Sequence, residues 1–192
     1  MRNVILLDLD GTIVDSYESV LQATEKSLTH FNIRIPSELY EVSEVGDMLS
    51  VACKYYCGHV TQEEFKLVYD SILLTNPTKG VYVNKSALEL ISNYIKNGYS
   101  LVVLTNKKQE VAEIICKDLF PPNTFLHVIG RNTVKPLKPS GNVFEELRKR
   151  GILLNDIYCL IGDSETDKKT ALLLRTRYVD IQTISPSENV VY

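Results

Sequence analysis

The stretch VILLDLDGTIVDS, residues 4–16, decides the fold. It begins with four apolar residues, a run typical of a short buried strand. Asp8 and Asp10 follow with one residue between them, before Gly11 and Thr12 break the strand. Because side chains alternate along a strand, the two carboxylates point the same way. The turn leaves them at the mouth of a sheet, where open α/β proteins bind ligands.

Two carboxylates this close repel each other, so each favours protonation of the other unless a cation or hydrogen-bond donors lie between them. A divalent metal ion is the simplest remedy. Aspartate and glycine are also common turn residues, so Asp8 or Asp10 alone would favour a plain loop. The functional interpretation therefore depends on partner motifs further along the chain.

Composition bounds the class of protein. A chain of 192 residues can hold one α/β domain with an inserted subdomain, and its hydrophobic core is large enough to fold without disulfides or structural metals. Its net charge of -3 and its pI near 5.7 give no electrostatic footprint for nucleic acid. No apolar run approaches the ~18 residues of a membrane span, and the first one is too short for a signal peptide. We expect neither nucleic-acid nor membrane partners.

The cysteines indicate a reducing compartment. All four are scattered without a CxxC pair, and the one tight group, Cys53, Cys57 and His59, lacks a fourth ligand and a good zinc spacing. Buried, reduced thiols are the simpler interpretation. We expect a cytoplasmic protein.

The segment after the aspartates has helical periodicity. Apolar residues recur at helical spacing over residues 17–31, and further helices are predicted near 48–56 and 61–74, with 45–47 as a kink or turn. No convincing strand stands between Ile13 and Pro77. Residues 15–78 are therefore predicted to be an all-helical insert, which could act as a lid over the strand mouth.

Residues 1–14 and 79–192 are predicted to form the α/β core. Continuous apolar runs, typical of strands buried on both faces, alternate there with helical patterns. The further strands are expected at 101–104, 125–129, 157–161 and 178–184. This alternation predicts a doubly wound parallel sheet with helices on both faces.

Parallel topology brings the carboxyl ends of the strands to one edge. Polar groups far apart in the sequence are therefore expected to converge there. They are Asp8, Asp10, Thr105, Asn106, the region of Lys135 and Lys138, Asp163 and Asp167.

Each of these clusters resembles a motif of the haloacid dehalogenase (HAD) superfamily. DLDGT is similar to its first motif, TNK to its second, Lys-Pro to its third and GDSETD to its fourth. The helical insert is similar to the C1 cap of the phosphoglycolate phosphatase-like branch. The resemblance spans nearly the whole chain and implies a Rossmann-like HAD core with a helical cap.

The resemblance also implies a reaction and its residues. It implies a magnesium-dependent phosphatase that acts on a small phosphomonoester through an aspartyl-phosphate on Asp8, with Asp10 as general acid and base. Mg²⁺ would be held by Asp8, the backbone carbonyl of Asp10 and Asp163, with Asp167 orienting its waters. The residues implied for the phosphoryl group are Thr105, Asn106 and Lys138.

Two lysines compete for the third motif, because VKPLKPSG contains both Lys135-Pro136 and Lys138-Pro139. The interval from Lys138 to Gly162 matches the family's usual interval better, so Lys138 is favoured. Lys135 is then interpreted as a charged, solvent-exposed residue of a loop.

Other functions remain open at this point. A sugar phosphomutase of the β-phosphoglucomutase type shares DxDG and a similar cap. A phospho-accepting receiver domain also places aspartates and a lysine at strand ends, but it needs neither Asp10 nor a lid. The substrate and the oligomeric state stay undecided. A phosphoglycolate site would need a cation or backbone donors in the insert for the substrate carboxylate, and Lys54 and Lys66 are available.

Overall fold

The computed structural model describes residues 3–133 and 135–184. A five-stranded sheet in the order β5-β4-β1-β6-β7 forms its centre, and every neighbouring pair is parallel. The strands are β1 (Val4–Leu7), β4 (Ser100–Lys108), β5 (His127–Arg131), β6 (Ile157–Gly162) and β7 (Arg177–Asp180). The chain moves outward from β1 first to one side and then to the other, which confirms the predicted doubly wound α/β fold.

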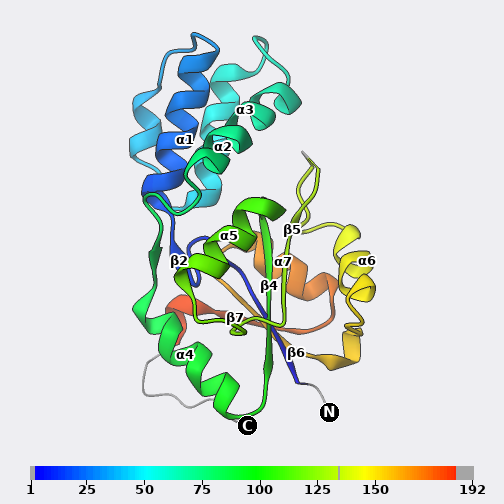
Figure 1. Cartoon of the computed structure of the whole chain (residues 1–192). Coiled ribbons are helices and arrows are strands. Elements are labelled where there is room, and N and C mark those ends of the chain that lie inside the picture. Colours follow the sequence, from blue (N-terminus) through cyan, green and yellow to red (C-terminus); the bar gives the residue numbers. More distant parts are fainter. Residues whose placement is uncertain (1–2, 134, 185–192) are drawn as a thin grey trace.

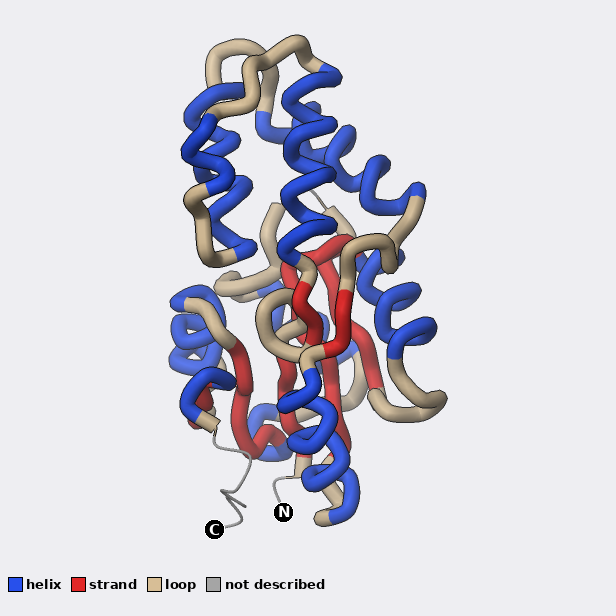
Figure 2. Tube along the Cα trace, turned by 90° about the vertical axis from the view of Figure 1, so that its left-hand side faces the viewer, coloured by secondary structure: helices blue, strands red, loops and turns tan. Residues whose placement is uncertain are grey.

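Both faces of the sheet are buried because successive side chains of β1 belong to different clusters. Ile5 and Leu7 join one hydrophobic cluster, and Val4 and Leu6 join the other. The first cluster includes residues of α4 (Lys85–Lys96) and α5 (Gln109–Leu119), and the second includes residues of α6 (Asn142–Lys149) and α7 (Glu165–Leu173). Figure 2 shows these helices on the two faces of the strands.

Three helices follow the first aspartates, as the periodicity predicts. They are α1 (Tyr17–His30), α2 (Val45–Tyr56) and α3 (Gln62–Thr75), with a short 3-10 helix, η1 (Ser37–Tyr40), between the first two. Thr61 and Glu64 form a capping box that fixes the start of α3. Figure 1 shows the three helices grouped beyond one end of the sheet.

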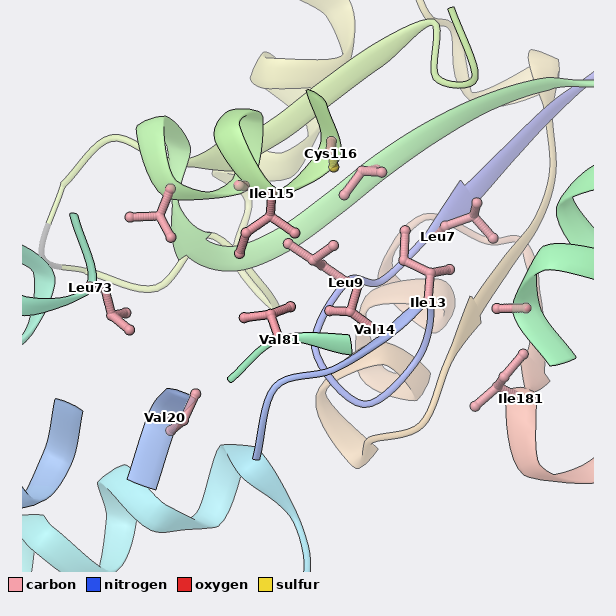
Figure 3. Packing of buried hydrophobic residues seen from close by; sticks show 14 of the residues in the cluster. Leu7, Leu9, Ile13, Val14, Val20, Leu73, Val81, Ile115, Cys116 and Ile181 are labelled. Atoms are coloured by element: carbon pink, nitrogen blue, oxygen red, sulfur yellow. The ribbon is translucent and has the colours of Figure 1, made fainter. Parts of the chain in front are cut away.

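The helical insert and the core share apolar packing. Val20 of α1 and Leu73 of α3 belong to the same buried cluster as Leu9, Val14 and Val81 of the core side. Figure 3 shows Leu73 and Val20 directed toward the region of Val81 and Val14. Removing such buried apolar area from water stabilises the contact by about 25 cal/mol per Å².

Two predictions about the insert are wrong. Residues 45–47 form the first turn of α2 and not a kink. A single helical glycine costs only about 1 kcal/mol relative to alanine, which Asp47 in the first turn partly offsets through the helix dipole. A strand also precedes the helices: β2 (Val14–Asp15) pairs antiparallel with β3 (Tyr82–Val83). Two residues are too few to give a periodic signal.

Two strand boundaries also differ from the prediction. β4 continues past residue 104 to Lys108, because pairing with β5 resumes at Lys108 and Arg131 after an irregularity. The last strand, predicted to reach 184, ends at Asp180. The Asp180 side chain accepts the backbone N–H of Gln182 and starts the 3-10 helix η3 (Ile181–Thr183) instead. A further 3-10 helix, η2 (Leu154–Asp156), precedes β6.

Within the described residues, none of the helices has the length and apolar character needed to cross a membrane. The four cysteines all carry free thiols, and Cys116 and Cys159 are buried. Cys53 is half-buried and Cys57 is exposed, so the expectation of burial is wrong for these two.

Candidate active site

The turn after β1 brings Asp8 and Asp10 to the carboxyl edge of the sheet. The backbone N–H of Asp8 still donates to Ile161 of β6 at 2.9 Å, so Asp8 is held like a strand residue. The chain then turns through Gly11, whose φ of +79° favours glycine. A β-carbon at Gly11 would lie 2.1 Å from the Asp163 carboxylate. Glycine is required there by both the conformation and the close approach.

Asp8 is buried among charged groups. Lys138 Nζ lies 2.7 Å from Asp8 Oδ1 and 2.5 Å from Asp167 Oδ1. Burial raises the pKa of Asp8 well above its ordinary value, and repulsion from Asp167 adds to this, while Lys138 opposes both. Attraction to the two carboxylates outweighs burial and raises the pKa of Lys138, which keeps its ammonium charged. One ammonium group thus faces two buried carboxyl groups.

Asp10 has its own partners. Ser16 Oγ donates to Asp10 Oδ1 at 2.5 Å, and Lys107 Nζ lies 3.0 Å from the same oxygen. Lys107 is buried, and the sequence interpretation assigned it no role. The available signal was its place two residues after Thr105, on the same side of a strand. The apolar run that predicts this strand ends at residue 104, so the pattern does not place Lys107 on the strand.

The end of β4 holds the loop that carries Lys138. The Asn106 side chain donates to the Lys138 carbonyl at 2.9 Å and accepts the Lys138 backbone N–H at 2.7 Å. Thr105 is buried, and its hydroxyl oxygen accepts the Lys107 N–H at 3.1 Å, which leaves the hydroxyl proton to be donated. Lys135 is exposed, so of the two candidate lysines the structure brings Lys138 to the aspartates.

The end of β6 supplies two more carboxylates. Thr12 donates to Asp163 Oδ1 at 2.8 Å, and burial raises the pKa of Asp163 despite that bond. Asp167 is fully buried, where Ser164 Oγ donates to its Oδ2 at 2.5 Å as part of the capping box of α7. A β-carbon at Gly162 would lie 2.5 Å from the Asp167 side chain, so glycine makes room for Asp167 beneath the strand end.

These carboxylates form a donor set suited to a hard cation. Asp8, Asp163 and Asp167 can each offer one oxygen, and these oxygens lie within 4.8 Å of one another. All three donors are oxygens, which Mg²⁺ prefers. Burial raises the pKa of Asp8 and of Asp163, a cost that a bound cation would relieve. The residues present therefore fit the magnesium ion implied by the motifs.

A cavity of about 520 Å³ separates the strand ends from the helical insert. Its core side includes all the predicted site residues except Asp167. Its insert side is largely apolar and aromatic and is lined in part by Val20, Leu49, Tyr56, Phe65 and Tyr69.

Lys66 is the cation that the insert contributes to this cavity. Its Nζ lies 4.5 Å from the centre of the Tyr69 ring. Lys54, the other lysine considered for a substrate carboxylate, is exposed and does not line the cavity.

A buried ion pair joins the insert to the core beside the cavity. Arg131, the last residue of β5, pairs through Nη2 with Asp70 of α3. Sequence reasoning missed both residues. Neither belongs to a motif, and their separation of 61 positions carries no local signal.

The comparisons with known proteins agree with this geometry. The family model for haloacid dehalogenase-like hydrolases matches residues 5–180. A curated relative is a phosphoglycolate phosphatase of Rhodospirillum rubrum, 25% identical over 182 residues, which covers 89% of this chain and 76% of the relative. Another is a phosphoglycolate phosphatase of Mesorhizobium japonicum, 27% identical over 187 residues, covering 88% of this chain and 78% of the relative.

A solved structure, that of a predicted phosphoglycolate phosphatase from Haemophilus somnus, is similar with a TM-score of 0.72 at 24% identity. The match covers 93% of this chain and 84% of the chain from Haemophilus somnus, and it shows that the two proteins share a fold. The family match confirms the resemblance carried by the four motifs. Because the family model matches most of this chain, the chain belongs to the haloacid dehalogenase-like hydrolase family.

Proposed function

We propose that this hydrolase is a magnesium-dependent phosphatase that cleaves a small phosphomonoester through an aspartyl-phosphate on Asp8. The observation that carries the proposal is the buried Asp8 carboxylate, 2.7 Å from Lys138 and beside Asp163 and Asp167, at the edge of a cavity that Asp10 also lines. Membership of the hydrolase family and the phosphatase names of the curated relatives support the same reaction.

Asp8 and Asp10 divide the chemistry between them. In the first step an Asp8 oxygen forms a bond to phosphorus while the bond from phosphorus to the leaving oxygen breaks, and Asp10 gives that oxygen a proton. In the second step Asp10 takes a proton from water, whose oxygen attacks phosphorus and releases Asp8 with inorganic phosphate. Ser16 and Lys107 hold the Asp10 carboxyl in place for both transfers.

Three hydrogen-bond donors would bind the negatively charged oxygens of the phosphoryl group. Thr105 has a hydroxyl proton to give, the backbone N–H of Asn106 lies beside it, and the Lys138 ammonium lies against the nucleophile. Such preorganised donors stabilise the transition state more than the ground state when the site excludes water.

The magnesium ion would be held by Asp8, by the backbone carbonyl of Asp10 and by Asp163, with Asp167 orienting its water ligands. When bound, it neutralises the carboxylates and polarises the phosphoryl group. Asp167 already has Ser164 and Lys138 as partners, which suits an orienting role.

Residues 15–78 are proposed to be the cap and residues 1–14 and 79–192 the catalytic core. The cap contributes the apolar wall of the cavity, which would exclude bulk water while the phosphoryl group passes from the substrate to Asp8. We also propose a cytoplasmic location, with which the four free thiols are compatible.

Phosphoglycolate is the first substrate to test, because the curated relatives bear its name and Lys66 offers a cation for its carboxylate. The cavity of about 520 Å³ also leaves room for larger leaving groups. A panel of phosphoglycolate, sugar phosphates and nucleoside monophosphates with Mg²⁺ would test the proposed reaction. Absence of magnesium-dependent phosphate release from every member would refute it, and an absolute need for a sugar bisphosphate would indicate a phosphomutase.

A pH dependence of substrate binding is expected from Lys66. Burial, followed by repulsion from Arg131 and Lys107, lowers the pKa of Lys66 to about 7, against the opposing attraction of Asp70 and Asp10. The ammonium is therefore charged below pH 7 and loses its charge above it. KM for phosphoglycolate should rise with pH through this range, by about tenfold, relative to KM for a monoester without a carboxylate.

Lys66→Met is the variant that checks this expectation. It should raise KM for phosphoglycolate at pH 6 and remove the difference in pH profile between the two substrates. Lys54→Met is the matched control, because Lys54 is an exposed lysine of the same insert. An unchanged phosphoglycolate profile in Lys66→Met would contradict the role given to Lys66.

A further inference from the structure

The ion pair between Asp70 and Arg131 joins the insert to the core at the wall of the cavity, which Arg131 lines and Asp70 does not. The two residues are 5% and 4% exposed. A buried ion pair is expensive to desolvate, and apolar residues of similar volume often stabilise a protein as well or better. Apolar residues at these two positions could therefore hold the insert against the core, so docking of the insert does not by itself explain the two charges.

Arg131 binds more than Asp70. Its Nε donates to the carbonyl of Asn106 at 2.8 Å, and its Nη1 donates to the carbonyl of Thr133 at 2.9 Å. One guanidinium thus joins α3 of the insert, the end of β4 and the chain that leaves β5. The planar guanidinium donates to these three acceptors from three different nitrogens, whereas lysine would have to donate from a single nitrogen.

The contacts continue from Asn106 to the nucleophile. The Asn106 side chain forms two hydrogen bonds with the backbone of Lys138, at 2.9 and 2.7 Å. The Lys138 ammonium in turn lies 2.7 Å from Asp8. A continuous series of polar contacts therefore leads from α3 through Arg131, Asn106 and Lys138 to Asp8.

We propose that Asp70 and Arg131 are positioning residues that make the placement of Asn106 and Lys138 depend on docking of the helical insert. Asp70 does not line the cavity; it acts on the site through its ion pair with Arg131 and through its charge near Lys66, and only the ion pair leads to Asn106 and Lys138. The inference rests on the proposed phosphatase function for its kinetic readout. It links the element that closes the site to the groups that bind the phosphoryl oxygens.

Asp70→Asn tests the link without changing any residue that lines the cavity. It leaves the Arg131 charge buried without its counterion, so the guanidinium should shift and release the Asn106 carbonyl. Per folded molecule, kcat/KM should fall about 10²-fold, the cost of an ångström-scale misplacement. The Kd for inorganic phosphate with Mg²⁺, measured by calorimetry, should rise about tenfold.

Asp70→Glu and Glu145→Gln serve as controls. Asp70→Glu keeps the carboxylate and should recover most of the affinity for phosphate. Glu145→Gln removes an exposed carboxylate that pairs with Lys149 on α6, away from the insert, and should leave both measurements unchanged. A merely structural role for the pair would lower the melting temperature of Asp70→Asn without altering its Kd for phosphate below that temperature, and this result would overturn the proposal.

The double variant Asp70→Leu with Arg131→Met separates adhesion from positioning. It replaces the charges by apolar groups, so it should keep the insert docked while removing the hydrogen bonds from Arg131 to the carbonyls of Asn106 and Thr133. We expect a melting temperature near that of the wild type with a kcat/KM reduced about 10²-fold. Wild-type kcat/KM in this protein would refute the positioning role.

Should the double variant fail to fold, Asp70→Asn and Asp70→Glu still decide the question. Binding of phosphate needs no turnover. Failure of the wild type on every phosphomonoester would therefore refute the proposed function while leaving the positioning role open to measurement.

Discussion

Asp8→Asn is expected to lose at least about 10⁴ in kcat, the largest effect of any single substitution in this chain. The amide oxygen of asparagine is a poor nucleophile toward phosphorus, so the aspartyl-phosphate does not form. The side chain keeps its shape at the end of β1, where the Asp8 backbone N–H bonds to Ile161. The loss should therefore be chemical and not a failure to fold.

The melting temperature separates these two explanations. Burial and Asp167 raise the pKa of Asp8, so its ionised form costs folding free energy in the metal-free protein, and stability increases as pH falls through the folded pKa. Removing that charge at neutral pH relieves the cost, although Lys138 loses one of its two partners. Metal-free Asp8→Asn should melt no lower than the wild type at pH 8.

Two measurements complete the test. Mass spectrometry after rapid acid quench should find a phosphorylated peptide containing residue 8 in the wild type and none in Asp8→Asn. Asp15→Asn is the matched control, since Asp15 is an exposed carboxylate seven positions on that accepts the Tyr17 N–H, a bond that asparagine can also accept. Unaltered turnover in Asp8→Asn would refute the assigned nucleophile.

The sequence permits prediction of this part of the site because it depends only on local pattern and topology. Val4–Leu7 is a run buried on both faces, so its strand must be central, and parallel pairing brings the ends of β4 and β6 to the same edge. Once Asp8 is placed at that edge, Thr105 and Asp163 follow from where their own apolar runs end.

The residues that sequence reasoning missed depend on longer-range packing. Asp70 lies in the middle of a helix, where an aspartate ordinarily faces solvent, and it is buried in its ion pair with Arg131 at the end of β5. Lys107 was missed because a strand's length is set by its neighbour: β4 continues only because Lys108 pairs with Arg131. No pattern within either segment contains that information.

Asp10→Asn is expected to cost about 10³ in kcat with alkyl phosphates, because it removes the proton donor for the leaving oxygen and the base for the attacking water. Asparagine can still accept the Ser16 hydroxyl proton, so the turn that precedes α1 should persist. Unlike Asp8→Asn, this variant keeps the nucleophile. Its defect should therefore depend on the leaving group.

That dependence gives the sharpest check on the division of roles. p-Nitrophenolate leaves without a proton donor, so p-nitrophenyl phosphate should still phosphorylate Asp8 in Asp10→Asn at a rate close to that of the wild type. Hydrolysis of the aspartyl-phosphate still lacks its base, so stopped-flow absorbance should record a burst of about one equivalent of p-nitrophenolate and then a stall. The burst should coincide with a stable phosphopeptide containing residue 8. Because a general acid contributes in proportion to the basicity of the leaving oxygen, an equal loss for alkyl and p-nitrophenyl esters, without a burst, would mean that Asp10 acts on the site's geometry and not by proton transfer.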